Sequence, residues 1–591
     1  MILIPILAII GYALLFSKLL KIKFTFILPS IASLLIVFLY FCTILEVLYY
    51  VTYFTYYIGI ICLIGYLVLV NYQRSYQVLQ KLPLTSKADS VVRQHLGEIL
   101  ALFLIILLFY LYTRNAYFSA WDDFSHWGVC SKELLHYNFF GQQYIHPSSI
   151  VKAHAHYPRG SAVYHYFMLL LPGYSEGNAL FAHFLLHLIF LAPLMANKRF
   201  WQTIFLIFYL LVIVVLYTTG IRSVYNDSTI GLMFSSLFAI YILEKNKETA
   251  FLLMLPIIAL LPLFREVGLW LATLASIILI FNHLKTNKEN NRNRIFFLYF
   301  MLLLLPFLCS SFWMNYFKST HDFFYRTQHS FTNVKLIAEN FNEQHILVLL
   351  KYCQALGNFL IKEGSIGIYI LCLLSWYGIY QYNRSLIQEY RFYLIATIIC
   401  CIIFALWRLY LYFVAFTYDE AIRAASLLRY LGCYCLVFAV ISSVYIKKTI
   451  YTVNIDKKVS FLLGLLFTVS LIVMGRSIAR IPKQLPKPQK VFYQQSEVIR
   501  NLLANNLIVD INFENKRDAL DCYKLNYRLA PYFAYESLLQ CLDYPINFQA
   551  KQQELEFIEP IELKQLLENK HINTHYKILY KPFMNKLDFK I

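Results

Sequence analysis

Long apolar runs, each close to the length needed to cross a lipid bilayer, recur along most of the chain and constrain its fold more than any other feature. A spanning helix needs about 20 consecutive apolar residues, and windows such as 204–216, 295–313 and 394–407 are almost wholly apolar. Charged residues make up only 14% of the 591 residues, whereas soluble domains carry roughly a quarter. The sequence therefore predicts an all-α polytopic membrane protein.

Apolar runs of about 17–25 residues predict about fourteen membrane-spanning helices. We expect them at 1–19, 24–46, 50–71, 97–113, 177–196, 201–219, 228–244, 250–264, 267–284, 295–315, 365–381, 392–414, 430–446 and 459–475. Basic clusters such as Lys18 to Lys23 and Lys447 to Lys458 then fall on one side, which the positive-inside rule assigns to the cytoplasm. The outer loops are 114–176, 220–227, 265–266, 316–364 and 415–429.

The net charge of +19 does not indicate a nucleic-acid partner, because the Lys and Arg residues lie in short loops where they encode orientation in the lipid bilayer. After a membrane module at 1–480, residues 485–591 mix polar and apolar positions. LIVDINF (507–513) alternates like a strand and IELKQLLEN (561–569) has helical spacing. We expect a small soluble α/β domain there, on the outer side unless the spans are miscounted by one.

Two adjacent carboxylates, Asp122 and Asp123, stand just beyond a predicted span in the long outer loop, close to Trp127. Carboxylates at a membrane boundary are costly unless they are solvated or bound to something. Asp is also favoured at helix starts, so the pair could instead cap a helix that begins near Phe124. The two interpretations are compatible.

Other charges stand at the outer ends of predicted spans. Arg265 and Glu266 separate two apolar runs, Asp227 opens another, and Arg429 opens a late one. Ionisable groups in membrane spans are functional candidates by default. The alternatives are that Arg265 and Glu266 pair with each other and that Asp227 caps its helix.

The segments that hold these residues resemble the GT-C superfamily, the multi-spanning glycosyltransferases that use polyprenyl-phosphate sugars. Members typically carry an acidic pair after an early span and a loop with Tyr-Pro or Pro-Pro before an amphipathic helix. Asp122-Asp123 and Tyr157-Pro158-Arg159-Gly160 match these features. Arg159 stands where many relatives have a second Pro.

WDDFSHWG (121–128) resembles more closely an uncharacterised bacterial group of GT-C-like proteins with a Trp-Asp-acidic-Phe-Ser-His-Trp signature. Three later segments share this likeness: Tyr225-Asn226-Asp227, LLPLFREVGL (260–269) and YDEAIRAASLLRYL (418–431). Arg265 departs from the pattern, in which Lys or another residue is expected.

The resemblance implies an inverting glycosyltransferase in a bacterial inner membrane, with its active face outside the cytoplasm. It would move a sugar from a polyprenyl-phosphate donor to a glycan or lipid acceptor of the cell envelope. The attacking hydroxyl must lose a proton, and we expect Asp122 to accept it, with Asp123 positioning it. Arg429, then Arg265, and Tyr430 are expected at the departing phosphate, because a guanidinium meets two phosphate oxygens at once.

Substrate-binding or supporting roles are expected for the neighbouring aromatic and charged residues His126, Trp127, Tyr157, Arg159, Asp227 and Glu266. The sequence names no definite cofactor and leaves open a divalent metal, Mg²⁺ or Mn²⁺, on Asp123 and His126. Two other function classes stay open. An O-antigen polymerase or ligase would use outer arginines without needing the early Asp pair, and a lipid or polysaccharide transporter would place charges at mid-membrane.

Overall fold

The computed structural model describes most of the first 452 residues, with several gaps, and the last hundred residues in short pieces. The described residues are 1–79, 100, 103–140, 157–196, 207, 210–214, 222–286, 292–320, 342–361, 363–414, 416, 418–452, 496–497, 500, 509–513, 524, 527–528, 576–581 and 586–590.

Ten helices among the described residues are long and apolar enough to cross a membrane. They are α1 (Leu3–Leu20), α2 (Phe24–Ile44), α3 (Leu48–Leu79), α7 (Glu176–Leu191) continued by η2 (Ala192–Met195), α9 (Asn226–Leu243), α10 (Lys247–Phe264), α11 (Val267–Thr286), α12 (Arg292–Thr320), α16 (Ile387–Val414) preceded by η4 (Arg384–Leu386), and α18 (Leu427–Thr452). The pair α14 (Glu343–Leu360) and α15 (Glu363–Tyr382), bent by 51°, counts as an eleventh if it is one broken span. The chain is a multi-pass membrane protein.

The described spans are fewer than the fourteen expected, for two reasons. The run at 97–113 contains a shorter apolar helix, Phe103–Thr113. The run at 459–475 lies outside the described residues, and only 207 and 210–214 of the run at 201–219 are described. The finer count therefore stays a prediction.

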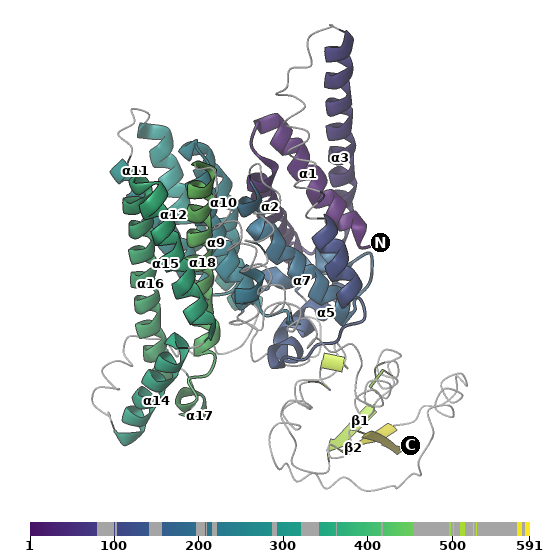
Figure 1. Cartoon of the computed structure of the whole chain (residues 1–591). Coiled ribbons are helices and arrows are strands. Elements are labelled where there is room, and N and C mark those ends of the chain that lie inside the picture. The colour runs from purple at the N-terminus through teal and green to yellow at the C-terminus, as the bar shows by residue number, and fades with distance from the viewer. Residues whose placement is uncertain are drawn as a thin grey trace.

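In Figure 1, α9 and α10 lie in the middle of the helical bundle, between α16 on one side and α3 on the other. Mean hydropathy and burial differ strongly between the spans. The α9 span has a mean hydropathy of only 1.2 and is 94% buried, whereas the α12 span reaches 2.3 and is 28% buried. α9 packs against α18, α10 and α7. A helix with polar positions is tolerated in the membrane when neighbouring helices surround it, so the polar residues of α9 are held inside the bundle.

At one edge of the bundle, α1 and α3 approach closely through small residues. A Cβ atom added to Gly11 would lie 2.1 Å from the carbonyl oxygen of Gly59, and one added to Gly59 would lie 2.6 Å from Ala8. Small residues of this kind let helix backbones pack directly in a membrane.

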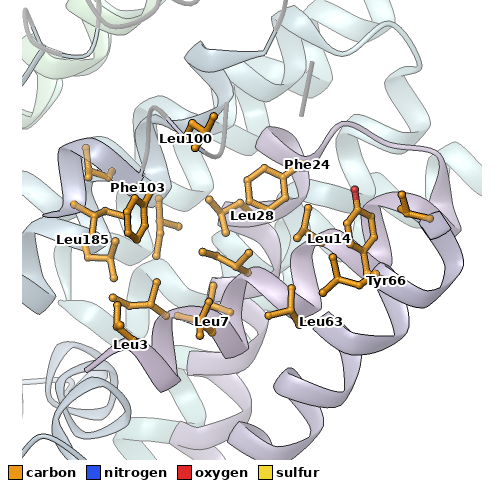
Figure 2. A pocket seen from close by; sticks show the side chains of 18 of the residues that line it. Leu3, Leu7, Leu14, Phe24, Leu28, Leu63, Tyr66, Leu100, Phe103 and Leu185 are labelled. Carbon is orange, nitrogen blue, oxygen red and sulfur yellow. The ribbon is translucent and has the colours of Figure 1, made fainter. Parts of the chain in front are cut away.

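An apolar cavity of about 520 Å³ lies beside this helix pair, between α1, α2, α3, α7 and the Phe103–Thr113 helix (Figure 2). Leu7, Leu28, Leu63 and Leu185 are among its lining residues, and Tyr66 and Asn71 bring the polar atoms. Such a lining accommodates hydrocarbon and offers little to a charged ligand.

The described pieces of the last hundred residues form a three-stranded sheet in the order β1-β2-β3. Strand β1 (Val509–Phe513) pairs in parallel with β2 (Tyr576–Lys581), which pairs antiparallel with β3 (Lys586–Lys590). The strand expected at 507–513 is therefore present as β1. The helix expected at 561–569 lies outside the described residues, so the α/β domain as a whole stays a prediction.

Candidate active site

Loops that lie far apart in the sequence meet at one end of the bundle in a network of ion pairs. Arg429 pairs through Nη1 with Asp122, and its Nε lies 2.8 Å from Oδ2 of Asp227. Arg265 pairs through Nη1 with Oδ1 of Asp227 and donates through Nη2 to the hydroxyl of Tyr430. We call these five residues the charged cluster. Its contacts join four of the loops that the sequence places on the outer side.

Burial differs across the charged cluster and sets which groups a substrate can reach. The side chains of Asp227 and Arg265 are 1% and 8% exposed, whereas those of Asp122 and Arg429 are 15% and 17% exposed. Asp122 and Arg429 therefore form the accessible edge of the cluster, and Asp227 holds the two arginines from below.

Helix capping does not explain the carboxylates of the cluster. Asp122 stands at the N-cap of the π-helix η1 (Asp123–Trp127), but its side chain makes no cap hydrogen bond there. The N-cap of α9 is Tyr225, so Asp227 lies inside the first turn, where the helix dipole still favours a negative charge. Each carboxylate is engaged by arginine instead of by a helix N-terminus.

Asp123 is oriented away from this network. It is fully buried, and its Oδ1 and Oδ2 accept hydrogen bonds from the backbone N–H groups of Val224 (2.9 Å) and Ala120 (3.3 Å). Burial raises the pKa of the Asp123 carboxyl well above its usual range. These bonds join the first outer loop to the start of α9, which is a positioning role.

Tyr225 completes that junction, and sequence reasoning did not single out its side chain. Its hydroxyl accepts a hydrogen bond of 2.7 Å from the backbone N–H of Asp122, and Cζ of Arg429 lies 4.7 Å from its ring centroid. Tyr225 belongs to the motif Tyr225-Asn226-Asp227, from which the sequence analysis assigned a role only to Asp227.

Arg265 is positioned by a sharp break between two helices. α10 contains Pro262 and ends at Phe264, Arg265 adopts an extended conformation, and α11 begins two residues later. The turn requires Gly268, since a Cβ there would lie 2.0 Å from the carbonyl oxygen of Leu261. The local sequence thus turns the Arg265 side chain into the cluster.

Arg429 is held by an unusual turn between α17 (Tyr418–Ile422) and α18. Ala424 and Ser426 adopt positive φ angles of 45° and 66°, which cost about 1–3 kcal/mol each for residues other than Gly. The hydroxyl of Ser426 accepts a 3.1 Å hydrogen bond from Nη2 of Arg429. Strained backbone of this kind persists where the surrounding structure enforces it, often at functional sites.

Aromatic rings enclose Arg265. Trp127 and Tyr157 stack with ring centroids 6.1 Å apart, and Cζ of Arg265 lies 5.7 Å and 5.9 Å from these two centroids. The ring of Tyr430 lies closer, at 4.7 Å, and His126 packs against Trp127 and Tyr157. The structure thus places Trp127 and Tyr157 beside Arg265, with His126 packed against both rings.

The two remaining site residues have different environments. Arg159 is buried and donates through Nη1 to the carbonyl of Phe140 (3.2 Å). Phe140 follows α5 (Gly128–Tyr137), so this hydrogen bond holds Arg159 against the first outer loop. Glu266 follows Arg265, whose direct partners are Asp227 and Tyr430. Burial raises the pKa of Glu266 to about 7, although the nearby Arg265 guanidinium opposes the shift.

The donor set near Asp123 does not fit a divalent metal. Both oxygens of Asp123 accept backbone N–H groups, and Nδ1 of His126 contacts the Ser125 hydroxyl at 2.7 Å. In the part of the chain that the structure describes, no three His, Cys, Asp or Glu side chains gather as metal ligands. The chemistry considered below is therefore that of the side chains alone.

Residues from the C-terminal region pack on the same loop. Lys132 donates to the carbonyl oxygens of Tyr527 (2.9 Å) and Arg528 (3.0 Å), and the Tyr527 ring contacts Phe118 and Phe124. Phe124 lies next to Asp123 in η1. These described residues of the C-terminal region therefore lie at the same end of the bundle as the charged cluster.

No protein-family model matches this chain, and neither does any curated protein. The function is therefore argued from the site itself. A partly accessible carboxylate beside several guanidinium groups can accept a proton while a leaving anion is stabilised. The site lies at one end of the membrane-spanning helices.

Proposed function

We propose that this chain is an inverting glycosyltransferase of a bacterial inner membrane, similar to the GT-C superfamily. It moves a sugar from a polyprenyl-phosphate donor to a cell-envelope glycan or lipid at the outer face. The observation that carries the proposal is the contact between Asp122 of the first outer loop and Arg429 of the last described span. It joins an acid to cations at the accessible edge of one site.

The reaction assigns a separate task to each side of this edge. The acceptor hydroxyl attacks the anomeric carbon while the Asp122 carboxylate takes its proton. The bond between that carbon and the phosphate oxygen breaks on the opposite face, and its electron pair leaves with the polyprenyl phosphate. A single displacement of this kind inverts the anomeric configuration and needs no carboxylate nucleophile.

The other residues support this step. Arg429 and Arg265 supply positive charge where the leaving phosphate gains negative charge, and Tyr430 holds Arg265. Asp123 fixes the position of its neighbour through the backbone bonds to Ala120 and Val224. Trp127 and Tyr157 offer aromatic faces beside Arg265, which suit the apolar face of a sugar.

The C-terminal region has a place in this proposal. Tyr527 and Arg528 pack on the loop that carries Asp122, so a soluble α/β domain outside the cytoplasm would border the acceptor side of the site. The fourteen-span topology expected from the sequence is part of the same proposal, since it puts the tail on this side.

The test is sugar transfer in reconstituted membranes, with radiolabelled polyprenyl-phosphate sugars and cell-envelope acceptors. Asp122→Asn should lower the rate about 10²- to 10⁴-fold, while Glu343→Gln, an exposed acid at the start of α14, should transfer at the wild-type rate. Equal rates in wild type and Asp122→Asn would overturn the base assignment. Transfer from pyrophosphate-linked glycans alone would favour a polymerase or ligase, and lipid flux without transfer would favour a transporter.

A further inference from the structure

A third arginine, Arg408, lies beside the charged cluster and has no role in the account above. It belongs to the inward stripe of α16, with Phe404 and Tyr412 on either side, while Ile403 and Leu406 of the same helix are exposed. Arg408 itself is 7% exposed. A guanidinium buried on the protein-facing side of a membrane span is retained for a reason other than solubility.

Aromatic rings surround Arg408 and connect it to the cluster. Its Cζ lies 4.3 Å from the ring centroid of Tyr430, 4.5 Å from that of Phe416 and 5.2 Å from that of Tyr412. Tyr430 also accepts the hydrogen bond from Arg265. The rings stabilise the cation by about 0.5–2 kcal/mol each. The Tyr412 hydroxyl also interacts with Arg408, but none of these three residues brings a negative charge.

The three arginines differ in how far protein groups satisfy them. Arg429 is ion-paired with Asp122 and Asp227 and donates to Ser426, although its Nε, 2.8 Å from Asp227, lacks hydrogen-bond geometry. On Arg408, by contrast, Nε and Nη2 are buried and have no hydrogen-bond partner among the described residues. Burying such donors without acceptors is costly, so these two nitrogens form a fork prepared for an anionic ligand.

The charges of the site support the same conclusion. Asp122 and Asp227 contribute two negative charges, and Arg265, Arg429 and Arg408 contribute three positive charges. The sum is one positive charge when Glu266 is protonated and zero when Glu266 is ionised. A sugar linked through a phosphodiester carries one negative charge, and the departing phosphate monoester carries up to two at neutral pH. When Asp122 accepts the proton of the acceptor, the site gains one positive charge as the leaving group gains one negative charge.

We propose that Arg408 binds the phosphate of a lipid-linked donor and holds it as it leaves. This rests on the glycosyltransferase proposal and transfers the first phosphate contact to Arg408, while Arg429 remains with Asp122. The phosphate is lipid-linked because Arg408 lies within a membrane span, six residues before the end of α16, next to side chains that face lipid. A planar guanidinium suits two phosphate oxygens, whereas Lys would keep only the charge.

The test measures binding of radiolabelled polyprenyl phosphate to the full chain in nanodiscs. Arg408→Gln should weaken binding about 10- to 100-fold, the effect expected for charged hydrogen bonds. Arg408→Lys should recover part of that loss. Arg384→Gln, an exposed arginine at the other end of the same span, should bind as wild type does. The uncharged polyprenol should bind equally to all four proteins, and inorganic phosphate should compete only weakly.

Several outcomes would overturn the inference. They are wild-type affinity for polyprenyl phosphate in Arg408→Gln, an equal loss of polyprenol binding, or inorganic phosphate competing as strongly as the lipid. Should Arg408→Gln fail to fold, Arg408→Lys carries the test, with an intermediate affinity expected and wild-type affinity contradicting the role of the fork. Arg408-dependent binding without sugar transfer would retain the phosphate site and remove the glycosyltransferase proposal, whereas transfer with unchanged binding would do the reverse.

Discussion

The two edges of the helical bundle are built by opposite means. α1 and α3 pack through Gly11 and Gly59 beside an apolar cavity, whereas α9, α16 and α18 enclose buried acids and arginines. Close packing of small residues holds membrane helices together without any desolvation penalty. Buried ions do carry that penalty, so the charged edge needs its carboxylate and guanidinium partners matched, whereas the apolar edge needs only close packing.

The largest expected effect is a loss of stability on replacing Asp227, the carboxylate that Arg265 and Arg429 share. Asp227→Asn leaves Arg265 and Arg429 without their shared carboxylate, and breaking a buried pair costs about 3–5 kcal/mol. Unfolding of the purified protein in detergent should show this loss, and sugar transfer should fall with it. Glu343→Gln serves as the control. A stability change below about 1 kcal/mol would mean that the charged edge is not held by these pairs.

The second largest effect is a pH dependence of stability, which we expect from Glu266 at the charged edge. The pKa of Glu266 is raised from 4.5 in the unfolded chain to about 7 in the folded protein. Its stabilising contribution is therefore complete below about pH 4.5 and is lost as the pH rises through 7. At about 1.36 kcal/mol per pKa unit, the loss is at most about 3 kcal/mol. The unfolding temperature should fall between pH 5 and pH 8, and less steeply in Glu266→Gln; parallel curves would contradict the assignment.

The smallest effect is expected at the apolar edge. Gly11→Ala places a methyl group against the Gly59 carbonyl and should destabilise the fold by about 1–3 kcal/mol. Gly65→Ala on α3 is the matched control, because a Cβ there meets nothing within 4 Å. Sugar transfer per folded molecule should stay at the wild-type level in both. A selective loss of transfer in Gly11→Ala would show that the two edges are coupled.

The sequence predicted the multi-pass class and placed the loops that hold the charged cluster on the side opposite the basic loops, because apolar length and loop charge are local signals. It did not reveal the partners. Asp122 and Arg429 are separated by 307 residues, and topology alone places many outer residues on the same side. Arg265 was weighed against its neighbour Glu266, whereas its direct partner is Asp227.

Arg408 shows a signal that was present but not used. It stands within the apolar run 394–414, where a charge is costly unless it faces the bundle interior. Arg408 contacts Phe416, which is near it in sequence, and also Tyr430, which lies on α18. The contact with Tyr430 could not be predicted from the spacing of residues along α16. Such contacts depend on how each helix is rotated about its axis. The sequence does not determine this rotation, because the positions that face lipid and those that face protein are both apolar.

The central claim is tested most directly by the anomeric configuration of the product of wild-type transfer, determined by NMR after reaction with a donor of known configuration. A single displacement assisted by Asp122 predicts a product with the inverted configuration. Retention of configuration would contradict that mechanism, and the absence of a glycoside from every polyprenyl-phosphate donor would contradict the proposed function itself.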